Sequence, residues 1–229
     1  MQLDQTGDLT QSPSRHDFIK KVYGHLFGAI IAFVGVLYLM FTTEIGLSII
    51  GFLLSINWLF ILGGFVLVGW LARMFASGGN KLSTQYLGLA IYVIIEAVIF
   101  SPLLATLLLS GGQGTEILAQ AAGVTFVGFA LLTAFVFITK KDFSFLRSLL
   151  IWVGIMAGVA IVAAVIFGIN LGIGFSIAMV VLAGAAILYD TSNIRKHYPE
   201  DQYVGAAIDL FASVALMFWY ILRIFMSRD

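Results

Sequence analysis

Long apolar runs with few charges alternate with short polar breaks along almost the whole chain. The runs lie near residues 24–43, 56–76, 84–108, 117–139, 146–168, 171–193 and 203–226. A helix needs about 20 mainly apolar residues to cross a bilayer, so this pattern predicts seven transmembrane helices. Breaks such as "SGGNK" (77–81), "TKKD" (139–142) and "RKHYPED" (195–201) separate them. The expected fold class is therefore an all-α polytopic membrane protein.

Two stretches near the start of the chain need separate treatment. The segment "IGLSIIGFLLSI" (45–56) is apolar but too short to span, so we expect a re-entrant or interfacial piece there. Residues 1–17 are mostly polar and are predicted to form a cytoplasmic tail, followed by one transmembrane domain over 18–229. No small-residue cleavage pattern follows the first apolar run, which indicates a retained span rather than a signal peptide.

Composition supports lipid as the main solvent of this chain. Hydrophobic residues make up 61% of it and charged residues only 10%, with a mean hydropathy of +1.04. A soluble domain carries roughly a quarter charged residues. The zero net charge gives no sign of a nucleic-acid partner. The lack of cysteine excludes disulfides, thiolate metal sites and cysteine nucleophiles.

Signatures of catalysis are missing from the sequence. The motifs HExxH, GxSxG and GxxxxGK[ST] do not occur. The three histidines, His16, His25 and His197, are scattered over a tail, a span start and a loop. The sequence therefore predicts neither an enzyme nor a bound cofactor, apart from an ion that the protein binds or conducts.

Basic residues predict the orientation in the membrane. Ten of the twelve fall on one side of the seven predicted spans: Arg15, Lys20, Lys21, Arg73, Lys81, Lys140, Lys141, Arg147, Arg195 and Lys196. The loops after spans 1, 3 and 5 contain no Lys or Arg, and the two remaining arginines, Arg223 and Arg228, lie near the C-terminus. By the positive-inside rule, the N-terminus is expected in the cytoplasm and the C-terminus outside.

Three acids, Glu96, Asp190 and Asp209, lie inside the predicted spans or at their inner edge. A charge at mid-bilayer costs at least about 2.5–3.5 kcal/mol, so such a residue suggests a function. Asp190 ends span 6 and Asp209 lies near the start of span 7, so the two can meet at the inner face. Two carboxylates there would favour a cation such as Ca²⁺, or an arginine. In the structural alternative, Asp190 is a hydrated helix end and Asp209 bonds a neighbouring helix.

Other polar residues in the spans also allow two interpretations. Ser213 follows Asp209 by one helical turn, and it either donates to a carboxylate or bonds its own backbone. Arg73, at the inner end of span 2, either extends towards the interface or pairs with Asp190. Glu96, midway through span 3, is either a protonated, hydrogen-bonded acid or part of a proton or cation relay. Asp142 is expected to cap the helix that follows it.

Several segments resemble the Bax inhibitor-1 (transmembrane Bax inhibitor motif) family in a bacterial form. They are "FIKKVYGHLF" (18–27), "TQYLGLAIYVIIEAVIFSPLL" (84–104), "TKKDFSFL" (139–146) and "ILYDTSNI" (187–194). The last helix, "DLFASVALMFWYILRIFMSRD" (209–229), is similar to the branch of the family that modulates the membrane protease FtsH.

This resemblance implies a seven-helix bundle, six helices around a central one, in the bacterial inner membrane. It also implies a pH-sensitive Ca²⁺ leak that is gated by an aspartate dyad between the last two helices. Asp190 matches the first member of the dyad, whereas the second is either Asp209 or Ser213. Arg73 resembles the arginine that holds the first aspartate in the closed state. The alternative function is a regulator that binds a membrane protease such as FtsH.

Overall fold

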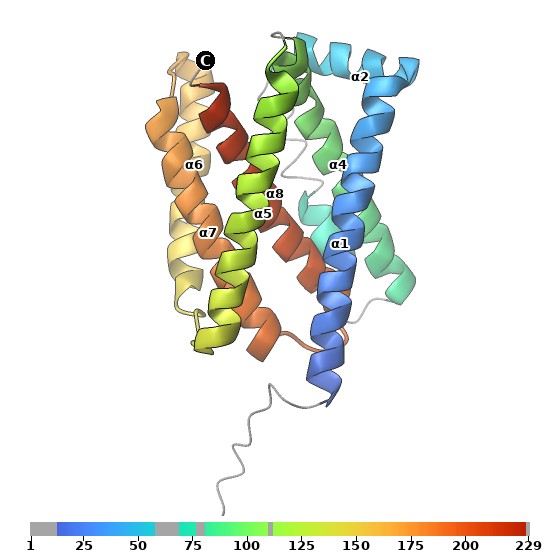
Figure 1. Cartoon of the computed structure of the whole chain (residues 1–229), viewed down its shortest axis with the longest axis vertical. Coiled ribbons are helices and arrows are strands. Elements are labelled where there is room, and N and C mark those ends of the chain that lie inside the picture. Colours follow the sequence, from blue (N-terminus) through green and yellow to red (C-terminus); the bar gives the residue numbers. More distant parts are fainter. Residues whose placement is uncertain (1–12, 58–68, 77–80, 110–111, 228–229) are drawn as a thin grey trace, which may run out of the picture.

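The computed structural model describes residues 13–57, 69–76, 81–109 and 112–227, and all the regular structure in them is helical. The helices are α1 (Pro13–Thr42), α2 (Glu44–Ser55), α4 (Leu82–Leu109), α5 (Gly114–Thr139), α6 (Leu146–Phe167), α7 (Gly172–Lys196) and α8 (Tyr203–Met226). Residues 69–76 are helical as well. The all-α class predicted from the sequence is confirmed (Figure 1).

Six of these helices are long and apolar enough to cross a membrane, and they correspond to six of the seven predicted spans. The other predicted span, 56–76, lies mostly outside the described residues; its described part, 69–76, is helical. Helix α1 begins at Pro13, well before the apolar run starts. Proline is favoured at a first helical position, where its fixed φ suits the helix and its missing N–H costs nothing.

The short helix α2 lies across the end of the bundle where α1 finishes (Figure 1). Thr43 is extended at the junction, and its hydroxyl accepts a hydrogen bond from the Gly46 N–H at 3.1 Å. A Cβ on Gly46 would come within 2.4 Å of the Met40 carbonyl oxygen, so only glycine permits this turn. The segment expected to be re-entrant or interfacial is thus a separate 12-residue helix.

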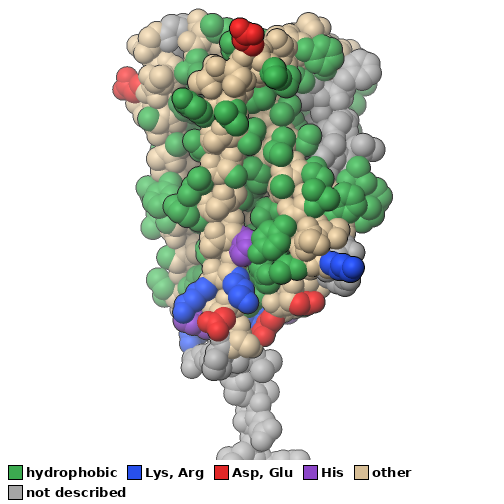
Figure 2. Space-filling model, turned by 90° about the vertical axis from the view of Figure 1, so that its right-hand side faces the viewer, with side chains coloured by type: hydrophobic (Ala, Val, Ile, Leu, Met, Phe, Trp, Pro, Cys, Tyr) green, Lys and Arg blue, Asp and Glu red, His purple; other side chains and the backbone are tan. Residues whose placement is uncertain are grey.

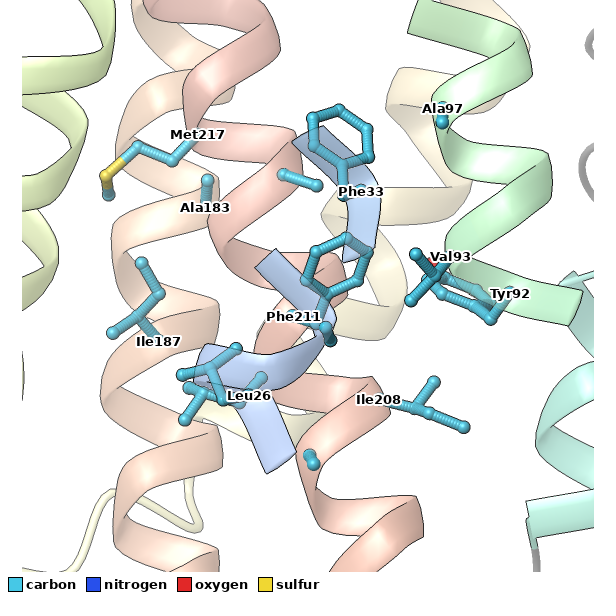
Figure 3. Close-up of a cluster of buried hydrophobic side chains, with 14 of the residues drawn as sticks. Leu26, Phe33, Tyr92, Val93, Ala97, Ala183, Ile187, Ile208, Phe211 and Met217 are labelled. Carbon is cyan, nitrogen blue, oxygen red and sulfur yellow. The ribbon is translucent and has the colours of Figure 1, made fainter. Parts of the chain in front are cut away.

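Helix α8 packs against α7, α1, α5 and α4. In the most apolar stretch of α8, 61% of the residues are buried inside the protein. In the corresponding stretch of α6, which packs against α7, only 11% are buried. The core between α1, α4, α7 and α8 is apolar and aromatic (Figure 3). Phe33 of α1 meets Phe211 of α8 edge-on, with ring centroids 5.9 Å apart, and Phe100 of α4 meets Trp219 of α8 at 4.8 Å. Such edge-to-face contacts add to the energy of burial.

Large apolar side chains cover the outside of the helices. Phe27, Tyr38, Phe126 and Ile138 are each more than 60% exposed. On the face shown in Figure 2, hydrophobic side chains cover the middle, and charged side chains gather towards the two ends. An apolar belt between charged ends is the surface that a bilayer requires. The chain is a multi-pass membrane protein.

Helix segment 69–76 approaches its neighbours closely through glycines. A Cβ on Gly88 of α4 would lie 2.6 Å from the Ala72 carbonyl oxygen, and one on Gly205 of α8 would lie 3.0 Å from that of Ala76. Small residues let transmembrane helices pack backbone to backbone. These two contacts place the segment, and Arg73 within it, between α4 and the start of α8.

The close approach at Gly88 makes that position sensitive to substitution. Gly88→Ala forces backbone atoms apart, so we expect a loss of about 1–3 kcal/mol of stability, the usual cost of overpacking. Thermal unfolding of the purified protein in detergent measures this as a lower Tm. Gly123→Ala on α5 is the matched control, because its Cβ meets nothing within 4 Å. Equal Tm values for the two variants would contradict the packing described for Gly88.

Candidate functional site

The candidate site lies where α7 ends and α8 begins, at what we name the basic end of the bundle. This is the end at which α1 starts, and Arg15, Lys21, Lys141, Arg195 and Lys196 lie there. The connection between α7 and α8 spans residues 197–202. It is short, so the acids of the two helices are held at the same end of the bundle.

Asp190 of α7 accepts a hydrogen bond from Ser213 of α8. The Ser213 hydroxyl lies 2.5 Å from Asp190 Oδ2, and Ser213 is only 8% exposed. Of the two interpretations of Ser213, donation to a carboxylate is the one the structure contains. Because lipid offers no donors, a carboxylate in this position must find them within the protein. The bond thus joins α7 to α8 at the level of Asp190.

Asp209 of α8 has different partners. Its Oδ1 lies 3.2 Å from Arg73 Nε, and its Oδ2 accepts a hydrogen bond from the Tyr198 hydroxyl at 2.6 Å. The Arg73 guanidinium carbon also lies 6.0 Å from the centre of the Tyr92 ring, within the range of a cation–π contact. Arg73 therefore forms its ion pair with Asp209, whereas the resemblance implied a contact with Asp190. Half of the Arg73 side chain is exposed, so the pair contributes about 1 kcal/mol or less.

Tyr198 was not identified from the sequence, where it is one residue of a polar break. It belongs to the α7–α8 connection, and its ring stacks on Phe18 of α1. Burial and the neighbouring Asp209 carboxylate both raise the pKa of the Tyr198 hydroxyl above its usual range. The hydroxyl therefore stays protonated and keeps donating to Asp209. Its position in a short connection between two acid-bearing helices was the one available signal.

Arg15 of α1 holds the end of α7 and the connection after it. Its Nη1 donates to the carbonyls of Ile194 at 3.3 Å and Tyr198 at 2.7 Å, and its Nε lies 3.7 Å from Glu200 Oε1. The last carbonyls of a helix have no partner within it, and a basic side chain satisfies them well. Arg15 thus fixes the backbone that carries the Tyr198 hydroxyl.

The loop between α5 and α6 is bound to the same end of α7. The Phe143 N–H donates to the Ser192 hydroxyl at 3.0 Å, and Arg195 Nη2 donates to the Lys141 carbonyl at 3.2 Å. Asp142 Oδ2 lies 3.8 Å from Lys196 Nζ and 3.4 Å from His197 Nε2. These contacts tie the loop to the helix that carries Asp190.

The expectation that Asp142 caps the following helix is wrong in detail. Phe145 is the residue at the N-cap of α6, and it makes no side-chain cap. Asp142 instead accepts a hydrogen bond from the Ser144 N–H at 2.9 Å, which forms a turn before the helix. That hydrogen bond, and then the nearby His197 and Lys196, lower the pKa of the Asp142 carboxyl.

Glu96 lies on α4 and is only 5% exposed. Its Oε2 has no hydrogen-bond partner among the described residues, and its neighbours along the helix, Val93, Ala97 and Phe100, belong to the apolar core. An unpaired buried oxygen costs about 1–3 kcal/mol. The structure thus places Glu96 in the core of the bundle, outside the set of contacts that hold Asp190 and Asp209.

The site offers oxygen ligands but only a partial set for a metal ion. Within the described residues, no three Asp, Glu or His side chains are grouped closely enough to hold a metal. Ca²⁺ takes six to eight oxygen ligands. An ion at Asp190 would therefore need the Ser213 hydroxyl, backbone carbonyls and water besides the carboxylate.

Comparison with known proteins gives a family and several relatives. The family model for "Inhibitor of apoptosis-promoting Bax1" matches residues 15–229. The chain is 34% identical over 134 residues to "Modulator of FtsH protease YccA" of Escherichia coli K12, which covers 57% of this chain and 60% of that protein. In another E. coli strain the equally similar protein is named an inner membrane protein. The match thus spans about three fifths of the length of these relatives.

Two further relatives widen the range of organisms. An uncharacterized protein of Helicobacter pylori 26695 is 29% identical over 216 residues, which covers 87% of this chain and 90% of that protein. LIFEGUARD 4 of Arabidopsis thaliana is 30% identical over 156 residues, covering 66% of this chain and 60% of the plant protein.

The Asp142 carboxylate gives the basic end a defined pH dependence. Its pKa is lower in the folded than in the unfolded protein, so its stabilising contribution is complete above the unfolded pKa of about 4. The contribution is lost as the pH falls through the lower, folded pKa. Asp142→Asn keeps the turn but removes the charge. We expect the variant to unfold at a lower Tm at pH 7, by a small amount since the group is partly exposed.

Thermal unfolding in detergent between pH 7 and pH 3 tests this expectation. The Tm difference between the protein and Asp142→Asn should shrink towards zero below about pH 4. A difference that persists unchanged at pH 3 would show that the effect of the substitution does not come from the charge.

Proposed function

This chain belongs to the family of inhibitors of apoptosis-promoting Bax1, and on that basis we propose that it is a non-enzymatic, pH-sensitive Ca²⁺ leak of the bacterial inner membrane. In this proposal seven helices span the membrane, with α8 at the centre of the bundle. The basic end faces the cytoplasm and the C-terminus lies outside, as the distribution of Lys and Arg favours.

The observation that carries the proposal is the pair of acids on facing ends of α7 and α8, each held by one or two polar contacts. Ser213 holds Asp190, while Arg73 and Tyr198 hold Asp209. Together these contacts join α7, α8 and segment 69–76 across the basic end. In the proposed closed state they keep the helix ends together. Loss of the Arg73–Asp209 ion pair would release segment 69–76 from α8 and thereby weaken the closure.

Cation passage would use the carboxylate oxygens as ligands that exchange with water. A hard cation such as Ca²⁺ prefers carboxylate, hydroxyl and carbonyl oxygens in a flexible site. Asp190 and Asp209 supply two carboxylates, and Ser213 a hydroxyl. Glu96, buried further along α4, is proposed as a relay group because acids inside a membrane span commonly mark an ion or proton path.

Arg73→Ala removes the ion pair to Asp209 and weakens the proposed closed state. A partly exposed pair contributes up to about 1 kcal/mol, so the expected rise in Ca²⁺ flux at neutral pH is about fivefold.

Asp190→Asn should flatten the pH profile of the Ca²⁺ flux, since it removes one titrating carboxylate. The measurement is Ca²⁺ entry into liposomes that contain the purified protein, from pH 5 to 8.

Asp201→Asn is the matched control for these liposomes, because Asp201 is an exposed acid in the α7–α8 connection at the same end of the bundle. We expect it to behave like the unaltered protein. The leak would be refuted by flux no greater than that of protein-free liposomes at every pH. A leak with normal pH dependence in Asp190→Asn would instead leave the leak standing and remove Asp190 from its gate.

A second candidate function is regulation of a membrane protease of the FtsH type. It is favoured by the similarity to the protein named a modulator of FtsH. It is also favoured by the contact of Asp190 with the neutral Ser213, because a leak gated by an aspartate dyad would be expected to have a second carboxylate there. The mostly polar residues before α1 would enter the cytoplasm at the basic end and offer the protease a segment to engage. The two functions are compatible in one protein.

Co-purification from bacterial membranes tests the second function. We expect the full chain to retain an FtsH-like protease, and a variant lacking residues 2–12 to lose most of it. This deletion leaves Ser14 and Arg15, which contact Glu200, in place. A variant with residues 2–12 replaced by a Gly/Ser segment of equal length controls for length. Failure of the full chain to retain any protease would refute the idea.

A further inference from the structure

A groove between α1 and α4 opens to the outside of the bundle. Its volume is about 540 Å³, within the range of small-molecule and lipid-sized sites. One end is polar, with Lys21 and His25 of α1 and Tyr86 of α4. Beyond it the wall is apolar, and Gly28, Ala32 and Val93 are among its residues. None of the acids or donors of the candidate site lines this groove.

The hollow exists because α1 presents small residues where a neighbour would pack. Gly24, Gly28 and Ala32 are spaced four residues apart and so lie on one face of the helix. A Cβ on Gly24 or on Gly28 would meet no atom within 4 Å. Such faces usually receive a second helix. No described residue fills this one, and the groove lies along it.

The polar end of the groove is organised around the Lys21 ammonium. His25 Nδ1 lies 2.6 Å from the Lys21 carbonyl and therefore donates to it, and Nε2 lies 2.7 Å from the Tyr86 hydroxyl. The Lys21 ammonium lies 5.3 Å from the centre of the Tyr203 ring. Over the described ranges of the chain, no carboxylate forms a salt bridge with Lys21. The Tyr86 hydroxyl donates to His25 Nε2, so the Lys21 ammonium is the group that is complementary to an anion.

We propose that this groove binds an anionic phospholipid from the leaflet at the basic end of the bundle. The Lys21 ammonium contacts the phosphate, and one acyl chain lies along Gly24, Gly28 and Ala32. Lysine and tyrosine are suited to the headgroup level of a membrane. Figure 2, which faces the side of α1 and α4, shows Lys, Arg and His side chains, together with Asp and Glu, gathered towards its lower end beneath an uncharged stretch.

The charge at the mouth favours a lipid over a transmembrane helix as the occupant. A helix docked along the small residues would bury the Lys21 ammonium against an apolar surface, which costs free energy unless the charge is paired. A phosphate supplies the pair, and the flexible acyl chain fits a groove lined by glycine. This site is independent of the leak and of the protease partner proposed above, and its test does not depend on either.

Native mass spectrometry of the full chain in detergent tests the proposal, with phosphatidylglycerol and phosphatidylcholine of identical acyl chains as probes. We expect the protein to bind phosphatidylglycerol about fivefold more tightly, the effect of one lysine near an anionic headgroup. Lys21→Gln should abolish this preference. Lys20→Gln, which alters an adjacent exposed lysine outside the groove, should retain it.

A second pair of variants tests the apolar part of the groove. Gly28→Leu fills it and should weaken binding of both lipids by fivefold or more. Gly35→Leu lies further along α1, outside the groove and with open space around it, and should have no effect. Tm values of all four variants in detergent identify any that fail to fold, and the remaining variants carry the comparison.

Three results would overturn the proposal. One is equal binding of the two lipids by the unaltered protein. Another is equal loss of preference in Lys20→Gln and Lys21→Gln, which would indicate diffuse attraction to the basic end. The third is a change of oligomeric state in Gly28→Leu with unchanged lipid binding, which would identify the occupant as a helix of a second copy.

Discussion

Polar groups inside a bilayer must be satisfied by the protein itself, and this requirement organises the basic end of the molecule. Asp190 and Asp209 extend from apolar helices, and each receives hydrogen bonds or an ion pair from another element. Ser213 of α8 donates a hydrogen bond to Asp190. Arg73 forms an ion pair with Asp209, and Tyr198 donates a hydrogen bond to it. Each carboxylate thereby becomes a cross-link between helices. The arrangement of α7, α8 and segment 69–76 at this end depends on those cross-links.

The surrounding contacts hold these donors in place. Arg15 binds the Ile194 carbonyl at the end of α7 and the carbonyl of Tyr198 itself in the connection. Phe18 of α1 stacks on the Tyr198 ring. On the other side, the α5–α6 loop is joined to α7 through Ser192 and Arg195. Helices α1, α7 and α8 and the α5–α6 loop thus meet around the short α7–α8 connection.

The same geometry is compatible with both proposed roles, the leak and the regulation of a protease. A set of polar contacts that is weak enough to break and close to the aqueous phase suits a gate that responds to pH. It also suits a surface whose shape a partner protein can sense at the basic end. The lipid-facing groove between α1 and α4 adds a different kind of contact, one with the membrane itself, on the outside of the bundle.

The apolar runs alone determined that the chain crosses a membrane many times, and they gave the ends of α8 and α6 almost to the residue, because a bilayer demands a long apolar stretch whatever its neighbours. Their position within or at the edge of apolar runs likewise singled out Asp190, Asp209 and Glu96. Partners could not be assigned in this way. Whether Ser213 or Asp209 contacts Asp190 depends on the rotation of α8 against α7, and Arg73 pairs with Asp209 because Gly88 and Gly205 admit segment 69–76 between two helices. The contacts of Tyr198 and Arg15 could not be read from the sequence, since they arise from the folding of a short connection. Apolar length is a property of the chain by itself, whereas the pairing of polar side chains is decided only when helices distant in sequence pack together.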